Sequence, residues 1–170
     1  MVERARAIRS ALIGCGVPFL VNDRVDVAMA SGADGVHLGR DDMAPADARR
    51  LLGHHAIIGA TVKADIDLIT ASGNAVDYAC IGGVFATLSK VNPDPPLGLS
   101  GLADLLGKLR TRQPDIPIGA IAGIGEANAS KVMEAGAAGV AVISAIFGAA
   151  DPAAAARRLR AIVDAARRPA

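Results

Sequence analysis

Two short segments contain the residues best suited to chemistry. Asp23 lies in the segment 21–24, which follows an apolar run, and Asp42 ends the segment 35–42, which begins with a second apolar run. Each carboxylate therefore stands where a buried strand is expected to open into a loop. If the two strands lie side by side, Asp23 and Asp42 converge on one hard cation. Mg²⁺ prefers carboxylate oxygens and usually keeps waters that a phosphate can displace, so the pair predicts a metal-assisted reaction at a phosphate or pyrophosphate.

A second group of polar residues lies in the long, proline-containing loop that follows the apolar run 77–82. Thr87, Ser89 and Lys90 bring two hydroxyl groups and one cation together. Long loops in compact domains are usually functional or disordered, and these side chains suit an oxyanion or a phosphate. An ordinary polar loop with a solvated lysine explains the same residues, and the sequence leaves both interpretations open.

The last two apolar runs each end in small or hydroxyl residues. Gly123 follows the run 117–121, and Ser144 follows the run 139–143. In barrels, a phosphate often binds the loops after the last two strands, held by backbone N–H groups. A tight turn at Gly123 is the simpler explanation when that position is considered alone. Because both final units end this way, we expect a phosphate site.

The three histidines are weaker candidates for functional residues than the aspartates and the phosphate-binding residues. His37 lies inside an apolar run, which is typical of a hydrogen-bonded core histidine, and His54 and His55 fall in a helix-to-strand turn, at the wrong end of a barrel for chemistry. The chain contains no Ser-His-Asp, HExxH or Cys-His pattern that indicates another mechanism.

Helices and strands must alternate to position these residues. Strands are expected at 18–21, 35–38, 56–60, 77–82, 117–121 and 139–143. Helices are expected at 2–14, 24–31, 44–52, 64–72, 99–112, 126–135 and 151–167. The strands are apolar almost throughout, which is typical of a parallel sheet with both faces buried.

Near-copies of one glycine-containing turn, at 31–36, 72–78 and 135–140, indicate repeated β-α units. A (β/α)8 barrel is the natural closed form of such repeats, and a doubly wound open sheet is the alternative. No GxGxxG follows the first strand, which argues against a dinucleotide site. Six strands are recognisable where a closed barrel needs eight, and residues 1–170 are expected to form one incomplete barrel domain.

Composition narrows the function classes. The chain is 52% apolar but only 2% aromatic. Its net charge is +1, so it lacks the strongly basic character that is typical of nucleic-acid-binding proteins. The longest uncharged run, 135–150, is too short and too rich in Gly and Ala for a membrane span. Cys15 and Cys80 are isolated, and buried free thiols in a reducing cytoplasm are expected.

Taken in order, these motifs resemble the thiamine phosphate synthase family, and they span nearly the whole chain. The matching segments are 21–26, 35–42, 58–61, 77–90, 120–124 and 139–146. The resemblance implies a (β/α)8 barrel that joins an aminopyrimidine diphosphate to a thiazole phosphate, releasing pyrophosphate with the help of Mg²⁺.

The family's functional residues can be carried over position by position. The resemblance implies that Asp23 and Asp42 hold magnesium. It places Asn22, Thr61 and Lys90 at the pyrimidine diphosphate, with Thr61 and Lys90 expected to be catalytic. It places the thiazole phosphate at Thr87, Ser89, Gly123, Ile143 and Ser144.

Some positions depart from the family pattern. Arg40 stands where Gln is usual, Ala86 where Pro is usual, Ser89 where Thr is common, and Ala122 where Gly is usual. The family also has a strand, a helix and a second strand before the equivalent of residue 2. We therefore expect this chain alone to have little activity and to self-associate through unpaired barrel edges.

Two alternatives to a synthase stay open. One is an isomerase resembling thiazole tautomerase, which usually needs a histidine near residues 59–63, where this chain has none. The other is an inactive phosphate-binding fragment.

Overall fold

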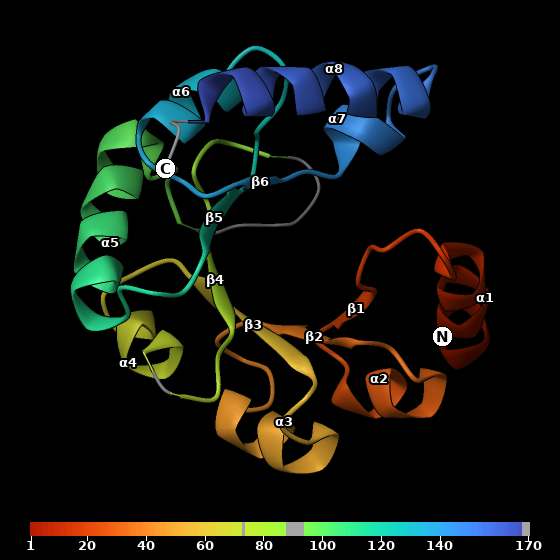
Figure 1. Ribbon diagram of the computed structural model, residues 1–170. Coiled ribbons are helices and arrows are strands. Elements are labelled where there is room, and N and C mark those ends of the chain that lie inside the picture. The colour runs from red at the N-terminus through yellow and green to blue at the C-terminus, as the bar shows by residue number, and fades with distance from the viewer. Residues whose placement is uncertain (73, 88–93, 168–170) are drawn as a thin grey trace. The chain divides into compact units, whose positions relative to one another are not determined.

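The computed structural model describes residues 1–72, 74–87 and 94–167, in which helices and strands alternate as far as α7 (Ser144–Phe147), which a second helix, α8 (Pro152–Ala166), follows directly (Figure 1). The chain forms two compact units, Met1–Ala79 and Cys80–Ala170. The expected helices and strands are confirmed within these ranges, with bounds that differ by a few residues.

The first unit contains four helices and three complete strands. These elements are α1 (Val2–Leu12), β1 (Leu20–Asn22), α2 (Val25–Ser31), β2 (Gly35–Leu38), α3 (Pro45–Leu52), β3 (Ile57–Val62) and α4 (Asp67–Ala71). Strand β4 (Tyr78–Ile81) begins at the end of this unit. Helix α2 ends at Gly32, whose φ of 68° is the left-handed conformation that the repeated glycine turn was expected to supply.

The second unit begins within β4. It continues with α5 (Gly98–Arg112), β5 (Ile118–Ile121), α6 (Ala129–Glu134), β6 (Val140–Ala141), α7 (Ser144–Phe147) and α8 (Pro152–Ala166). The short helix α7 was not expected. Strands β5 and β6 pair in parallel, with Ala120 opposite Val140, and α5 buries four leucines, Leu102, Leu105, Leu106 and Leu109, at helical spacing.

The sheet of the first unit has two different faces. Strands β1, β2 and β3 pair in parallel, and the register places Val21 beside Val36 and Val36 beside Ile58. These residues are buried with apolar side chains of α1, α2 and α3, and Figure 1 shows α2 and α3 along that side of the strands. Burying each such side chain contributes about 1.5–3 kcal/mol.

Most residues of β2 and β3 are buried, as expected for a parallel sheet. The opposite face of these strands is apolar at Leu20 and Ile57 and becomes polar toward the carboxyl ends. The register sets Asn22 beside His37 and His37 beside Gly59, and Thr61 follows on the same face of β3. Asn22 is exposed, while His37 and Thr61 are only partly buried. Polar side chains therefore gather on one face of the sheet.

The two cysteines differ in environment. Cys80 is buried in β4, and burial raises the pKa of its thiol to about 12. Cys15 is exposed, which corrects the expectation that both thiols are buried: the turn after α1 projects it away from the core. None of the helices in the described part of the chain has the length and apolar character needed to cross a bilayer.

Candidate active site

Asn22 and Asp23 lie at the carboxyl end of β1. Asn22 is the last residue of the strand, opposite His37 of β2, and the Asp23 backbone N–H donates to the His37 carbonyl oxygen at 2.9 Å. Asp23 has a φ of 64°, which is a left-handed conformation for a residue with a side chain. The backbone itself therefore turns sharply at the first candidate metal ligand.

Asp42 lies in the loop that leaves the neighbouring strand β2. The Gly39 N–H donates to its Oδ2 atom at 2.7 Å, and the carboxylate is half-buried. Its negative charge acts on His37: burial lowers the pKa of His37, and the charge of Asp42 opposes that shift only in part. Asp23 thus follows β1 directly, Asp42 lies in the loop four residues beyond the end of β2, and these two strands pair in parallel.

A hydrogen-bonded trio crosses the polar face of this sheet. His37 Nδ1 lies 2.8 Å from the Tyr78 hydroxyl, and His37 Nε2 lies 2.8 Å from Thr61 Oγ1. The trio needs Gly59, because a Cβ added there would lie 2.2 Å from the Tyr78 ring. His37 is therefore the hydrogen-bonded histidine that was expected, but it lies beside Thr61 at the candidate site.

Sequence reasoning missed Tyr78 as a member of this group. The signal that could have found it is Gly59, because glycine inside a strand often marks the close approach of another group.

An ion pair joins the loops that follow β2 and β3. Arg40 donates from Nε and Nη2 to the two carboxylate oxygens of Asp67, at 2.6 and 2.8 Å. Asp67 is 5% exposed and also accepts from the backbone N–H groups of Lys63 and Ala64. Burial alone would raise the pKa of Asp67, but Arg40 and these N–H groups outweigh it and hold that pKa below its usual range.

Three of the predicted phosphate-binding residues line one pocket of the second unit. Thr87, Gly123 and Ser144 border a cavity of about 660 Å³, which the turn 124–128 also lines. Ser144 is the first residue of α7, and Ile143 precedes it with an exposed side chain. Ser89 and Lys90 lie outside the described residues.

The turn beside this pocket requires a glycine. Gly123 has a φ of 65°, and a Cβ added there would lie 2.4 Å from the Ala86 carbonyl oxygen. Asn128 holds the turn from the other side: its side-chain amide donates to the Gly123 carbonyl and accepts from the Gly125 N–H. The backbone at this pocket is therefore fixed by both sterics and hydrogen bonds.

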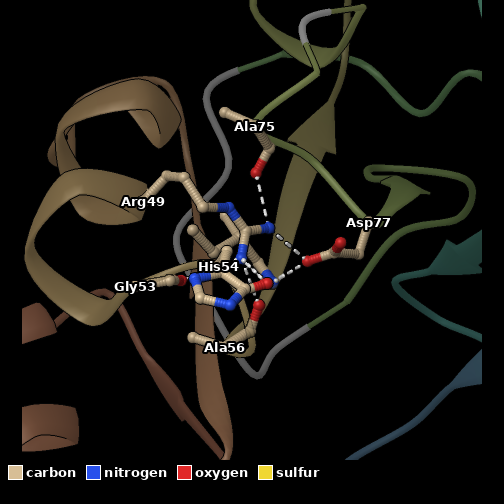
Figure 2. A network of polar contacts seen from close by, with 7 residues as sticks. Arg49, Gly53, His54, Ala56, Ala75 and Asp77 are labelled. Carbon is tan, nitrogen blue, oxygen red and sulfur yellow. Dashed lines mark hydrogen bonds and ion pairs between the residues drawn. The ribbon is translucent and has the colours of Figure 1, made fainter.

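The amino ends of the first unit's strands carry a different polar network, centred on Arg49 of α3 (Figure 2). The guanidinium donates to the carbonyl oxygens of Gly53, His54, Ala56 and Ala75. It also pairs with Asp77 at 2.6 Å, and the same Asp77 oxygen accepts from the Ile58 N–H at 2.7 Å. The side chains of Arg49 and Asp77 are therefore hydrogen-bonded to backbone groups, and this network stabilises the fold at this end of the sheet.

The donor set at β1 and β2 fits magnesium. The described residues contain no group of three or more His, Cys, Asp or Glu side chains that could hold a metal ion. Mg²⁺, however, is usually bound by one or two carboxylates together with waters and substrate phosphates. Two carboxylates in the segments after adjacent strands are donors of the kind that Mg²⁺ takes.

Comparison with known proteins identifies the family. The sequence model of the thiamine monophosphate synthase family matches residues 1–146. A thiamine-phosphate synthase of Agrobacterium fabrum is 59% identical over 98% of this chain and 76% of that relative. The chain belongs to this family, which confirms the resemblance inferred from the motifs.

Solved structures agree on the fold. A thiamine phosphate pyrophosphorylase from Pyrococcus furiosus has a TM-score of 0.82 and 37% identity, over 97% of this chain and 76% of that one. A 3-hexulose-6-phosphate synthase, at 24% identity, covers 95% of this chain and 80% of its own with a TM-score of 0.68, and this likeness concerns the fold alone. The chain therefore has an α/β fold like that of TIM-barrel proteins, with six parallel strands among the residues that the structure describes.

Proposed function

We propose that this protein is a thiamine-phosphate synthase. The observation that carries the proposal is the position of Asp23 and Asp42, at the carboxyl ends of paired strands in a chain 59% identical to a relative of that name. The isomerase alternative gains no support from the relatives, since those reported above carry the synthase or pyrophosphorylase name.

In the proposed reaction, the C–O bond of an aminopyrimidine methyl diphosphate breaks and pyrophosphate leaves with the bonding electrons. The thiazole nitrogen then donates its lone pair to the exposed methylene carbon, forming a C–N bond and a thiazolium product. No strong base is needed for this substitution. The protein must stabilise the departing diphosphate and hold the nucleophile in line.

Each polar group of the first unit has a role in this proposal. Asp23 and Asp42 would hold Mg²⁺, which supplies positive charge to the diphosphate when it is bound. Asn22 would contact the pyrimidine diphosphate from the end of β1. Thr61, whose hydroxyl is already oriented by His37 at 2.8 Å, would present a fixed polar group to the same substrate.

The second unit would bind the thiazole phosphate. Backbone N–H groups around Gly123, together with the hydroxyls of Thr87 and Ser144, suit three phosphate oxygens. Ile143 would cover the thiazole side of the pocket. Ser89 and Lys90 complete the proposed set, with Lys90 at the diphosphate.

We also propose that the six strands correspond to six of the eight strands of a (β/α)8 barrel. The reported relatives support this, because the chain spans about three quarters of their length. Strand β1 pairs with β2 alone within the first unit, so its outer edge is suited to pairing with a further strand or a second molecule. The proposed setting is the cytoplasm, with small phosphorylated substrates as the partners.

The test is formation of thiamine phosphate, measured by its conversion to fluorescent thiochrome. The 170-residue chain is incubated with both substrates and Mg²⁺, and again after a strand-helix-strand segment from a longer relative is added at its N-terminus. We expect product from the extended form and little from the 170-residue form, because the added segment supplies the two further strands that the proposal requires.

Asp42→Asn in the extended form is the matched control, since it keeps the shape and removes the charge. Absence of product from both forms would identify an inactive phosphate-binding chain. Full turnover by the 170-residue form would contradict the proposed need for two further strands.

A further inference from the structure

The Arg40–Asp67 ion pair connects two loops that follow adjacent strands. Arg40 lies between Gly39 and Asp42 in the loop after β2, and Asp67 opens α4 after the loop from β3. Both nitrogens used by Arg40 are bonded to Asp67 in the bidentate, fork-to-fork arrangement. The pair therefore sets the separation between the loop that carries Asp42 and the loop that follows Thr61.

Burial and hydrogen bonds hold the Asp67 carboxylate in place. Its carboxylate is 5% exposed, and it accepts two further hydrogen bonds from the Lys63 and Ala64 N–H groups, at 2.8 and 3.0 Å. A buried carboxylate is tolerated only when it is paired and hydrogen-bonded. These contacts fix the Asp67 carboxylate in position, while the Arg40 side chain is half-exposed at 50%.

In the loop after β2, Arg40 is next to Gly39, and Gly39 is hydrogen-bonded to Asp42. The Gly39 N–H donates to Asp42 Oδ2 at 2.7 Å, and the Asp42 N–H donates back to the Gly39 carbonyl at 3.3 Å. A Cβ at position 39 would lie 3.1 Å from the same carboxylate oxygen. Arg40 directly follows Gly39, so a shift of the Arg40 backbone would move the N–H that donates to Asp42.

We propose that Arg40 and Asp67 are positioning residues, which hold the loop after β2 so that the Asp42 carboxylate keeps its orientation at the carboxyl end of that strand. The role of Asp42 as a magnesium ligand rests on the proposed function; the orientation of its carboxylate does not. Residues that orient metal ligands commonly affect metal affinity 10- to 100-fold when they are replaced.

The experiment uses the 170-residue chain and two measurements. The first is the amide proton resonance of Gly39 in ¹H–¹⁵N spectra, which reports the hydrogen bond to Asp42. The second is the affinity for Mn²⁺ alone, followed by the loss of the free-ion electron paramagnetic resonance signal. The variants are Arg40→Gln, Arg40→Lys and Asp67→Asn, and Arg49→Gln is the matched control, because it breaks an Arg–Asp pair at the opposite end of the same strands.

We expect Arg40→Gln and Asp67→Asn to move the Gly39 amide proton upfield and to weaken Mn²⁺ binding roughly tenfold. Arg40→Lys should give an intermediate result, since an ammonium cannot reproduce the fork. Arg49→Gln should lower the melting temperature and leave both readouts unchanged. An unchanged Gly39 resonance in a folded Arg40→Gln variant would overturn the proposal and leave the pair a purely stabilising contact.

Two outcomes separate this inference from the proposed function. If the unaltered chain does not bind Mn²⁺ but Arg40→Gln still shifts Gly39, the metal site is wrong and the positioning role stands. If Asp67→Asn fails to fold, Arg40→Gln decides the matter, because it leaves the backbone hydrogen bonds to Asp67 intact.

Discussion

Both ends of the first unit's strands contain an arginine paired with an aspartate, but the two pairs are built in opposite ways. At the amino ends, the arginine is the hub: Arg49 is bonded to four carbonyl oxygens, and its partner Asp77 is 47% exposed. At the carboxyl ends, the aspartate is the hub: Asp67 is buried among N–H donors, and Arg40 is half-exposed. The first arrangement supplies donors to backbone carbonyl oxygens, and the second connects loops that carry candidate functional residues.

The difference indicates that stability and chemistry are assigned to opposite ends of the same strands. Within the described part of the chain, Arg49 donates to backbone carbonyls at the amino ends of the strands and to Asp77, whereas Arg40 is two residues from Asp42. The comparison predicts that variants at the amino ends change stability without changing chemistry, and that variants at the carboxyl ends do the reverse.

The largest effect is expected from Arg49→Ala. It removes the arginine donor from two partly buried carbonyl oxygens, those of Ala56 and Ala75, and each such group costs about 1–3 kcal/mol. The exposed side of the pair with Asp77 contributes less, so we expect a loss of about 2–4 kcal/mol in the free energy of unfolding, measured by urea denaturation. The affinity of the folded fraction for the substrates should not change. A loss of substrate affinity would contradict the proposal that the amino ends of the strands serve stability and the carboxyl ends serve chemistry.

Asp42→Asn tests the other end. Removing the charge should lower turnover of the extended chain about 100-fold, because a charge-assisted contact contributes roughly 1.5–3 kcal/mol. The melting temperature should move by no more than a few degrees. Asp47→Asn, at a half-exposed acidic position of α3 that pairs with Arg50, is the control, and it should leave turnover unaltered.

Gly123→Val carries the comparison into the second unit. The new side chain conflicts with the Ala86 carbonyl and with a φ of 65°, so the turn must shift. We expect binding of the thiazole phosphate to weaken at least about tenfold, in line with the loss of a charge-assisted hydrogen bond, as isothermal titration calorimetry would measure. Gly107→Val, in open space on α5, is the control, and equal losses from both variants would argue against a phosphate site.

The smallest effect concerns pH and His37. Its pKa is lowered in the folded protein by burial, so the unfolded chain binds more protons in the window below the unfolded value of about 6.5. Stability should therefore fall as pH drops through that value, and His37→Asn should flatten the decline measured between pH 7 and 5. An equally steep decline in the variant would assign the pH dependence to other groups.

The sequence predicted the parts of the site that depend on the backbone. Asp23 and Asp42 follow apolar runs, and parallel strands always bring such positions to one edge of a sheet. Gly123 and Ser144 lie at one pocket for the same reason.

Contacts between side chains of different strands were not predictable in this way. The trio of His37, Thr61 and Tyr78 depends on strand register, and the Arg40–Asp67 pair depends on how two loops fold toward each other. Periodicity contains neither piece of information. Helix α7 and the exposure of Cys15 were missed because both follow from local turns of a few residues, where burial patterns are too short to interpret.

The left-handed backbone at Asp23 has an evolutionary consequence. An L-residue in this conformation costs roughly 1 kcal/mol relative to glycine, so Asp23→Gly would relieve strain while removing a carboxylate. A gene copy released from selection would therefore gain this backbone energy on losing the carboxylate. Retention of aspartate at this position is therefore a more sensitive sign of continued selection for activity than retention of any core residue.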